Sequence, residues 1–173
     1  MPGTLGHLSF RFLDVVSSRA LDSAERAIVE SWLNKELATA FFEQPPHDQR
    51  HGYEAGLVTV DAGADDDVIV SAVLHDIGKR HSRLGVIGRV IASVLIKLGV
   101  PLTRRMQLYR DHGLTAAREL AGLGAPALSI DYALHHHGSK PDSIPEDTWR
   151  LLSRADEPKA VKMARPGISS ATR

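Results

Sequence analysis

A histidine and an aspartate, His75 and Asp76, end a run of small and apolar residues, and Lys79 follows them. Neighbouring residues on a helix point about 100° apart, so both side chains reach one metal ion only at a helix end or a bend. Gly78 favours such an end, because glycine readily adopts the left-handed conformation that caps a helix. An imidazole and a carboxylate presented together suit a hard or borderline divalent cation. Alone the dipeptide is a weak signal, since such pairs arise by chance.

More histidines, with one further acid, extend this pair into an ordered series along the chain. The series reads His51, His75-Asp76, His112, His135-His136-His137 and Asp156. Each member lies near the end or middle of a separate expected helix, and packed helices can aim several side chains at one cavity. Neutral imidazoles and carboxylates would hold one or two divalent cations. A hydroxide shared by two cations would be a nucleophile already deprotonated near neutral pH.

The elements that must position these residues are helices. Apolar residues recur with helical spacing, and no sustained two-residue alternation predicts a strand. The sequence therefore predicts an all-α bundle of about seven to nine helices. We expect helices near 8–18, 22–44, 47–60, 65–77, 86–98, 102–123 (with a break near Gly113), 125–136 and 145–156. The expected organisation is one domain with an N-terminal helical layer at 1–46, a core at 47–157 and a flexible tail at 158–173.

Composition bounds the function. The 173 residues, 43% of them hydrophobic, suffice for one domain with a real core. The absence of cysteine excludes disulfides and thiolate ligands and fits a cytoplasmic protein. No signal-peptide pattern is seen, and the longest apolar stretch, 90–98, is too short to span a bilayer. The net charge of zero gives no global argument for nucleic acid. We therefore expect neither a membrane nor a nucleic-acid partner.

The charge is uneven locally, since residues 77–110 contain no Asp or Glu. This window holds eight cations, Lys79, Arg80, Arg83, Arg89, Lys97, Arg104, Arg105 and Arg110. One interpretation is a solvated basic surface balanced by acids at 61–67. The other is an electrostatic funnel that draws an anionic substrate toward His75 and Asp76.

The series resembles the HD superfamily of metal-dependent phosphohydrolases, whose pattern is His…His-Asp…Asp with extra histidines in some branches. The resemblance covers about residues 48–156. It rests on Asp48-Gln49-Arg50-His51, Ala72-Val73-Leu74-His75-Asp76-Ile77-Gly78-Lys79, Tyr109-Arg110-Asp111-His112-Gly113, Ala133-Leu134-His135-His136-His137 and Arg154-Ala155-Asp156.

Site roles follow from this resemblance residue by residue. It implies a first cation held by His51, His75, Asp76 and Asp156, and a second held by His112, His136, His137 and a bridging Asp76. The register within the triplet stays open by one, with His136 preferred to His135. Lys79 is similar to the lysine of the family that contacts phosphate or the bridging acid, so the expected catalytic residues are Asp76 and Lys79. Substrate contacts are expected from Arg80, Arg83 and Arg110.

The implied function is hydrolysis of a phosphate ester or anhydride, with attack by a metal-bound hydroxide. Iron or manganese is the expected metal, with magnesium, nickel, cobalt and zinc left open. The expected substrate is a small phosphorylated molecule, a nucleotide above all. Gly138-Ser139-Lys140-Pro141 departs from the Glu and Gly-Tyr-Pro of the cyclic-di-GMP phosphodiesterases in this superfamily, which argues against that substrate. The His112-Gly113 and Arg154-Ala155-Asp156 segments look closer to HD hydrolases of diadenosine tetraphosphate.

Two alternatives to hydrolysis stay open. One is a non-catalytic HD module that binds a nucleotide and signals through the apolar helix, and the other is a di-iron oxygenase on the same fold. The apolar helix at 86–98 could be core, a lid over the site or the interface of a homodimer, and the glycines at both ends favour the last two. His47 could assist a ligand or lie on the surface.

Overall fold

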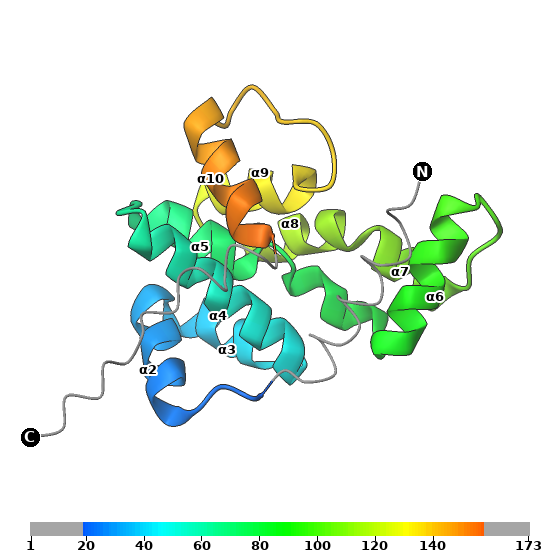
Figure 1. Ribbon diagram of the computed structural model, residues 1–173, viewed down its shortest axis with the longest axis horizontal. Helices are drawn as coiled ribbons and strands as arrows, with labels where there is room; N and C mark the ends of the chain where they lie inside the picture. Colours follow the sequence, from blue (N-terminus) through cyan, green and yellow to red (C-terminus); the bar gives the residue numbers. More distant parts are fainter. Residues whose placement is uncertain (1–18, 158–173) are drawn as a thin grey trace, which may run out of the picture.

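The computed structural model describes residues 19–157, which form nine α-helices, one 3-10 helix and no strand (Figure 1). In chain order these are α2 (Ser23–Trp32), α3 (Lys35–Phe42), α4 (Pro46–Asp61), α5 (Asp66–Leu74), η1 (Ile77–Ser82), α6 (Val86–Lys97), α7 (Arg104–Arg110), α8 (His112–Gly122), α9 (Ala127–His135) and α10 (Glu146–Asp156). The all-α prediction is confirmed. The helix expected at 8–18 and the tail expected from 158 lie outside the described residues.

Two of the expected helices are each divided into two. The single helix expected at 22–44 is wrong, because the chain leaves the helix at Leu33 and restarts at Asn34, whose side chain caps α3 by accepting the N–H of Leu37 at 2.8 Å. The stretch at 102–123 breaks at Asp111, two residues before the expected position. The helix expected to reach Ile77 ends at Leu74, and η1 follows.

The core holds together the helices that carry the histidine series. α4 packs against α5, α5 against α9, α9 against α8, and α10 against α4. Phe41, Leu74 and Leu120 are fully buried in the larger apolar cluster. Tyr132 and Leu152 belong to a second cluster that joins α9 to α10. Each such side chain contributes roughly 1.5–3 kcal/mol through burial, so the helix ends that meet near the middle of the bundle are fixed by packing.

Glycine allows two backbone segments to approach near the series. A Cβ atom built on Gly78 of η1 would lie 2.1 Å from the carbonyl oxygen of His112 and 2.8 Å from the nitrogen of Ala116. No side chain fits in that space, because real Cβ contacts do not fall below about 3.0 Å. The close approach brings the first turn of α8 against the segment that follows His75 and Asp76.

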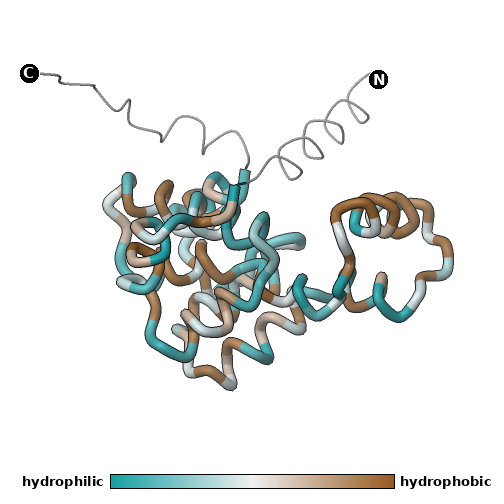
Figure 2. Tube along the Cα trace, turned by 90° about the horizontal axis from the view of Figure 1, so that it is seen from below, coloured by the Kyte–Doolittle hydropathy of each residue, from teal (hydrophilic) through white to brown (hydrophobic). Residues whose placement is uncertain are grey.

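The pair α6 and α7 projects from the body as an arm, which Figure 2 shows at one end of the molecule with both hydrophobic and hydrophilic stretches. Ala92 is the single buried residue of the helix α6. Ile87, Ile91 and Val94 of α6 are exposed, as is Leu98, which follows its last residue. The lid or homodimer interface expected at 86–98 stays a prediction. Over residues 19–157, we find no helix with both the length and the apolar character needed to cross a bilayer.

Substituting Gly78 with Ala should destabilise the fold, because the new methyl group meets backbone that cannot rotate away. We expect a loss of about 1–3 kcal/mol in the free energy of unfolding, measured by urea denaturation. Gly122→Ala is the matched control, since a Cβ atom there meets nothing within 4 Å. Equal stability of the two variants would contradict the close approach of η1 and α8.

The ion pair between Glu25 and Arg50 should make stability depend on pH. Arg50 donates two hydrogen bonds of 2.7 Å to Glu25, and these lower the pKa of Glu25 from 4.5 to about 2. A depressed folded pKa means that the pair stabilises the protein fully above pH 4.5 and loses this contribution as the pH falls toward 2. The difference in unfolding free energy between wild type and Glu25→Gln should shrink over that range. A difference independent of pH would refute this role.

Candidate metal centre

Four members of the series converge from three helices at one point. His51 lies on α4, His75 and Asp76 follow α5, and Asp156 ends α10. Oδ1 of Asp156 lies 3.1 Å from Nε2 of His51 and 3.2 Å from Nε2 of His75. The two Nε2 atoms are 3.3 Å apart. One ligand atom from each of the four residues lies within 4.8 Å of every other, so these side chains could hold one metal ion.

A second group gathers on the other side of Asp76. Nε2 of His112 and Nε2 of His136 lie 3.2 and 3.3 Å from Oδ1 of Asp76, and 3.4 Å from each other. The ring of His137 lies 4.0 Å from that of His136, centroid to centroid. Asp76, His112, His136 and His137 also satisfy the 4.8 Å criterion for a metal site. The structure thus brings together all seven residues predicted as metal ligands.

Asp76 belongs to both groups through different oxygens. Its Oδ1 faces His112 and His136, while its Oδ2 lies 3.4 Å from Nε2 of His75 and 3.8 Å from Nε2 of His51. The ammonium of Lys79 also donates to Oδ2. Oδ1 is buried and has no hydrogen-bond partner of good geometry among the described residues. A carboxylate placed in this way can bridge two cations.

Backbone carbonyls orient three of the imidazoles. Nδ1 of His75 lies 2.8 Å from the carbonyl oxygen of Ala72, Nδ1 of His112 lies 2.6 Å from that of Tyr109, and Nδ1 of His136 lies 2.8 Å from that of Ala133. A carbonyl only accepts, so each Nδ1 must carry the proton and each Nε2 of a neutral ring presents its lone pair. The lone pairs of His112 and His136 face one another at 3.4 Å between Nε2 atoms, which requires a proton or a cation between them. The donor set therefore fits divalent cations.

The charges around Asp76 also favour a bound cation, as the arrangement of the imidazoles does. Burial opposes its ionisation, but Lys79 and His75 hold the pKa of Asp76 well below its usual range. Burial also opposes protonation of His75, yet the charges of Asp76 and Asp156 raise the pKa of His75 to about 10. Burial lowers the pKa of His136, which favours the neutral form that binds metal. The two carboxylates thus attract positive charge, and a bound cation would displace the proton of His75.

The geometry follows from where each helix stops. His75 is the C-cap of α5, and Asp76 then adopts φ −100° and ψ 5°, outside the helix. This change of backbone direction lets the side chains of His75 and Asp76 both point toward one centre. His112 begins α8, and His136 follows the last residue of α9. Gly113 lets these two segments touch, since a Cβ atom there would lie 2.7 Å from the carbonyl oxygen of Ala133.

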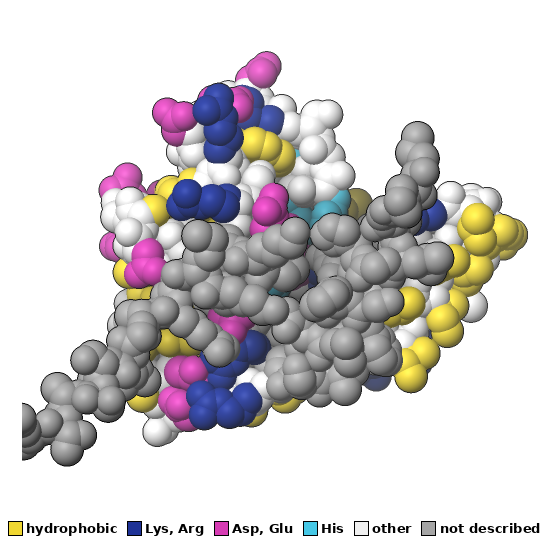
Figure 3. All heavy atoms as spheres, viewed as in Figure 1, with side chains coloured by type: hydrophobic (Ala, Val, Ile, Leu, Met, Phe, Trp, Pro, Cys, Tyr) yellow, Lys and Arg dark blue, Asp and Glu magenta, His cyan; other side chains and the backbone are white. Residues whose placement is uncertain are grey.

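The centre is open to solvent on one side. Side-chain exposure is 27% for His51 and 25% for Asp156, and His137 is exposed. Histidine side chains are visible at the surface in Figure 3. His75 and Asp76 lie deeper, with at most 5% exposed. A small molecule can therefore approach the inner ligands from the side of His51 and His137.

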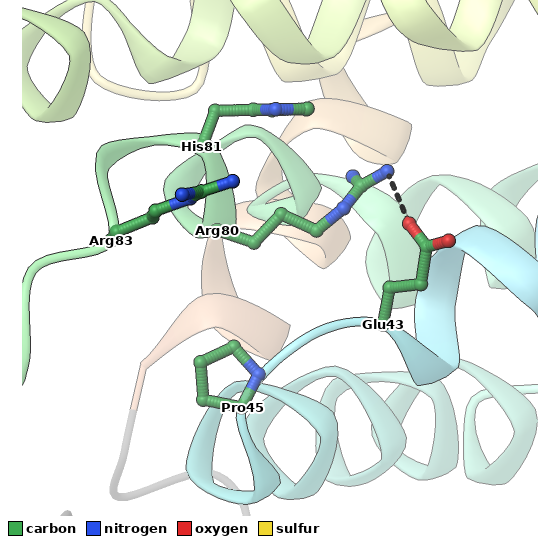
Figure 4. Close-up of a pocket in the computed structure, with 5 residues that line it drawn as sticks. All are labelled: Glu43, Pro45, Arg80, His81 and Arg83. Carbon is green, nitrogen blue, oxygen red and sulfur yellow. Dashed lines mark hydrogen bonds and ion pairs between the residues drawn. The ribbon is translucent and has the colours of Figure 1, made fainter.

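The structure does not place the arginines predicted to bind substrate at this centre. Arg80 forms ion pairs with Glu119 and Glu43, and Arg110 pairs with its neighbour Asp111 at 2.7 Å. Arg80 and Arg83 line a separate hollow of about 590 Å³, drawn in Figure 4, which none of the seven predicted ligands lines. Acids from outside the basic window thus neutralise several of its cations, which favours the interpretation of a balanced surface for that part.

The sequence predicted no role for three residues that lie beside the centre. Asp48 receives two hydrogen bonds from Arg89, and the ring of Tyr109 stacks on His112 at 5.8 Å between centroids. Spacing gave one usable signal, because Asp48 precedes His51 by three residues and so shares its helix face. Nothing in the sequence indicated that Arg89, in the apolar helix, is the partner of Asp48.

Comparison with known proteins identifies no relative: no family model, no curated protein and no solved structure matches the chain. The chemistry of the centre therefore rests on the residues described above.

Substituting Asp76 with Asn should remove metal binding, since the amide keeps the shape but loses the charge that both groups share. We expect the affinity for Mn²⁺ to fall at least about 100-fold at both subsites, as measured by calorimetric titration. Asp61→Asn, at the exposed end of α4, is the control and should bind as the wild type does. Unchanged binding in Asp76→Asn would remove this residue from the ligand set.

Proposed function

We propose that the chain is a metal-dependent phosphohydrolase of the HD type, which cleaves a phosphate ester or anhydride in a small phosphorylated substrate. The observation that supports the proposal most is the division of the Asp76 carboxylate, whose two oxygens face different sets of histidines. This arrangement suits two neighbouring cations, and paired cations can clamp the attacking and leaving oxygens of a phosphoryl transfer.

In the proposed centre the ligands divide by helix. His51, His75 and Asp156 would hold one cation, His112, His136 and His137 the other, and Asp76 both. Iron or manganese is the proposed metal, since the mixed nitrogen and oxygen donors suit either. When bound, such cations supply Lewis acidity toward a phosphoryl oxygen and lower the pKa of water toward neutrality.

Lys79 contributes positive charge beside the shared carboxylate. Its ammonium lies on Oδ2 of Asp76, and the charge of Asp76 raises the pKa of Lys79 although burial opposes this. The ammonium is thus a permanent cation at neutral pH. A fixed charge in a partly buried site stabilises the negative charge that develops on phosphoryl oxygens more strongly than it would in water.

A nucleotide is the substrate we propose. The ammonium of Lys79 beside Asp76 and the open side of the centre support a small anion. The departure at 138–141 from the cyclic-di-GMP enzymes argues against that dinucleotide.

Hydrolysis can be tested with a panel of nucleotides and phosphate esters. Protein loaded with Mn²⁺ or Fe²⁺ should release inorganic phosphate or a nucleotide from at least one member, and chelator should abolish release. A nucleotide-binding module would retain ligand without product, and an oxygenase would consume dioxygen without releasing phosphate from the panel. Failure across a broad panel with full metal occupancy would overturn the proposal in favour of one of these two.

The role of Lys79 predicts a specific kinetic defect. Lys79→Met should keep bound metal but lower kcat by about 10²–10³, the range seen when one charge-stabilising donor is removed from an active site. Lys97→Met, on the exposed surface of α6, is the matched control and should keep wild-type kcat. Steady-state kinetics together with metal analysis checks this, and a wild-type kcat in Lys79→Met would exclude the role.

A further inference from the structure

A buried ion pair ties α6 of the arm to the body, while α7 packs against η1, where Arg105 donates to the carbonyl oxygen of Ser82 at 3.0 Å. Apart from Ala92, no residue of α6 is buried, so apolar packing alone holds it weakly. Arg89 reaches from α6 to Asp48 on α4 and donates two hydrogen bonds of 2.6 and 2.7 Å to the two carboxylate oxygens. Side-chain exposure is 11% for Arg89 and 7% for Asp48. Such a two-pronged contact fixes orientation as well as distance.

The pair lies between residues of the two metal subsites. On one side, Asp48 precedes the ligand His51 by three residues on the same helix. On the other, the guanidinium of Arg89 lies 6.0 Å from the ring centroid of Tyr109. Tyr109 in turn contacts the ligand His112 twice, through its stacked ring at 5.8 Å and through its carbonyl oxygen, 2.6 Å from Nδ1. A continuous set of contacts thus runs from the helix of His51 to the ring of His112.

The two subsites differ in whether a residue of the arm contacts one of their ligands. His75 of the first subsite is 1% exposed and follows α5, which packs against α4, α9 and α10. Tyr109 and His112 lie at the junction of α7 and α8, and no residue of α7 is buried. The second subsite thus contacts the arm through Tyr109, although His112 itself is 4% exposed and α8 also packs against α9 and η1.

From this path we propose that Asp48 and Arg89 are positioning residues for the second metal subsite. The inference rests on the two-cation centre proposed above. The ion pair holds the arm so that Tyr109 fixes the tautomer and the ring plane of His112, and His112 then directs Nε2 toward Oδ1 of Asp76. Neither Asp48 nor Arg89 is a ligand. Both act through Tyr109 on a residue that is.

A second ion pair on the same helix supplies a matched control. Arg50 and Glu25 are joined by two hydrogen bonds of 2.7 Å, with side-chain exposures of 11% and 17%. This pair joins α4 to the chain ahead of α2 and to α2, away from the arm. Its geometry and burial resemble those of the first pair, but it makes no contact with Tyr109 or His112.

The test compares Asp48→Asn/Arg89→Met with Glu25→Gln/Arg50→Met. Each double variant removes both charges, which avoids leaving one buried charge unpaired. Binding of Mn²⁺ is followed by calorimetry, and electron paramagnetic resonance separates coupled from isolated ions. In the first variant, affinity for the second Mn²⁺ should fall at least about tenfold while the first ion is kept. The control variant should bind both ions as the wild type does. Arg89→Lys should bind the second ion with intermediate affinity, since it keeps the charge but not the double contact.

Retention of both ions at wild-type affinity in Asp48→Asn/Arg89→Met would overturn the inference. So would equal weakening of both subsites in the two double variants, since that pattern reports general loss of stability. A wild type that binds fewer than two ions would remove its basis. The readout is independent of turnover, so a protein that shows the expected binding but releases no phosphate would refute the proposed hydrolysis and leave this inference standing.

Discussion

A buried carboxylate that several imidazoles and an ammonium surround is the constraint on which the rest of the structure depends. Asp76 is 5% exposed and stays ionised because positive charge lies beside it, although burial disfavours its charged form. Burying an unpaired charge is prohibitively costly, so the groups around it must remain in place. Lys79 supplies part of the compensating positive charge, because its ammonium donates a hydrogen bond to Oδ2. Oδ1 has no hydrogen-bond partner of good geometry within residues 19–157, and His112 and His136 lie beside it at 3.2 and 3.3 Å.

The bundle places these groups around Asp76 because several of its helices end close to this residue. Five helices contribute, and each presents its residue within a turn of its end or, for His51, along a packed face. Packing at Gly78 and Gly113 brings backbone close enough for His112 and His136 to reach the same oxygen. The carbonyls three residues before His75, His112 and His136 then fix the protonated nitrogen. The same sequence features thus determine the fold and the direction of the lone pairs.

How far the sequence predicted this arrangement differs between parts of the site. The ligand series was predictable because residue type and order survive any error in helix bounds, and His75-Asp76 required a helix end that the structure has. The break at Leu33 was missed, because the apolar spacing continues across it and Asn34 caps only locally. The partners of Arg80 and Arg89 could not be predicted, since they come from acids about 40 residues away in sequence. Local patterns carry no information on such pairs.

The central claim, that Asp76 joins two cation subsites, is tested most directly by anomalous diffraction from crystals of the Mn²⁺-loaded protein. The account predicts two anomalous peaks, one among His51, His75 and Asp156 and one among His112, His136 and His137, with the Asp76 carboxylate between them. Peaks elsewhere, or a single peak that Asp76 does not ligate, would contradict it.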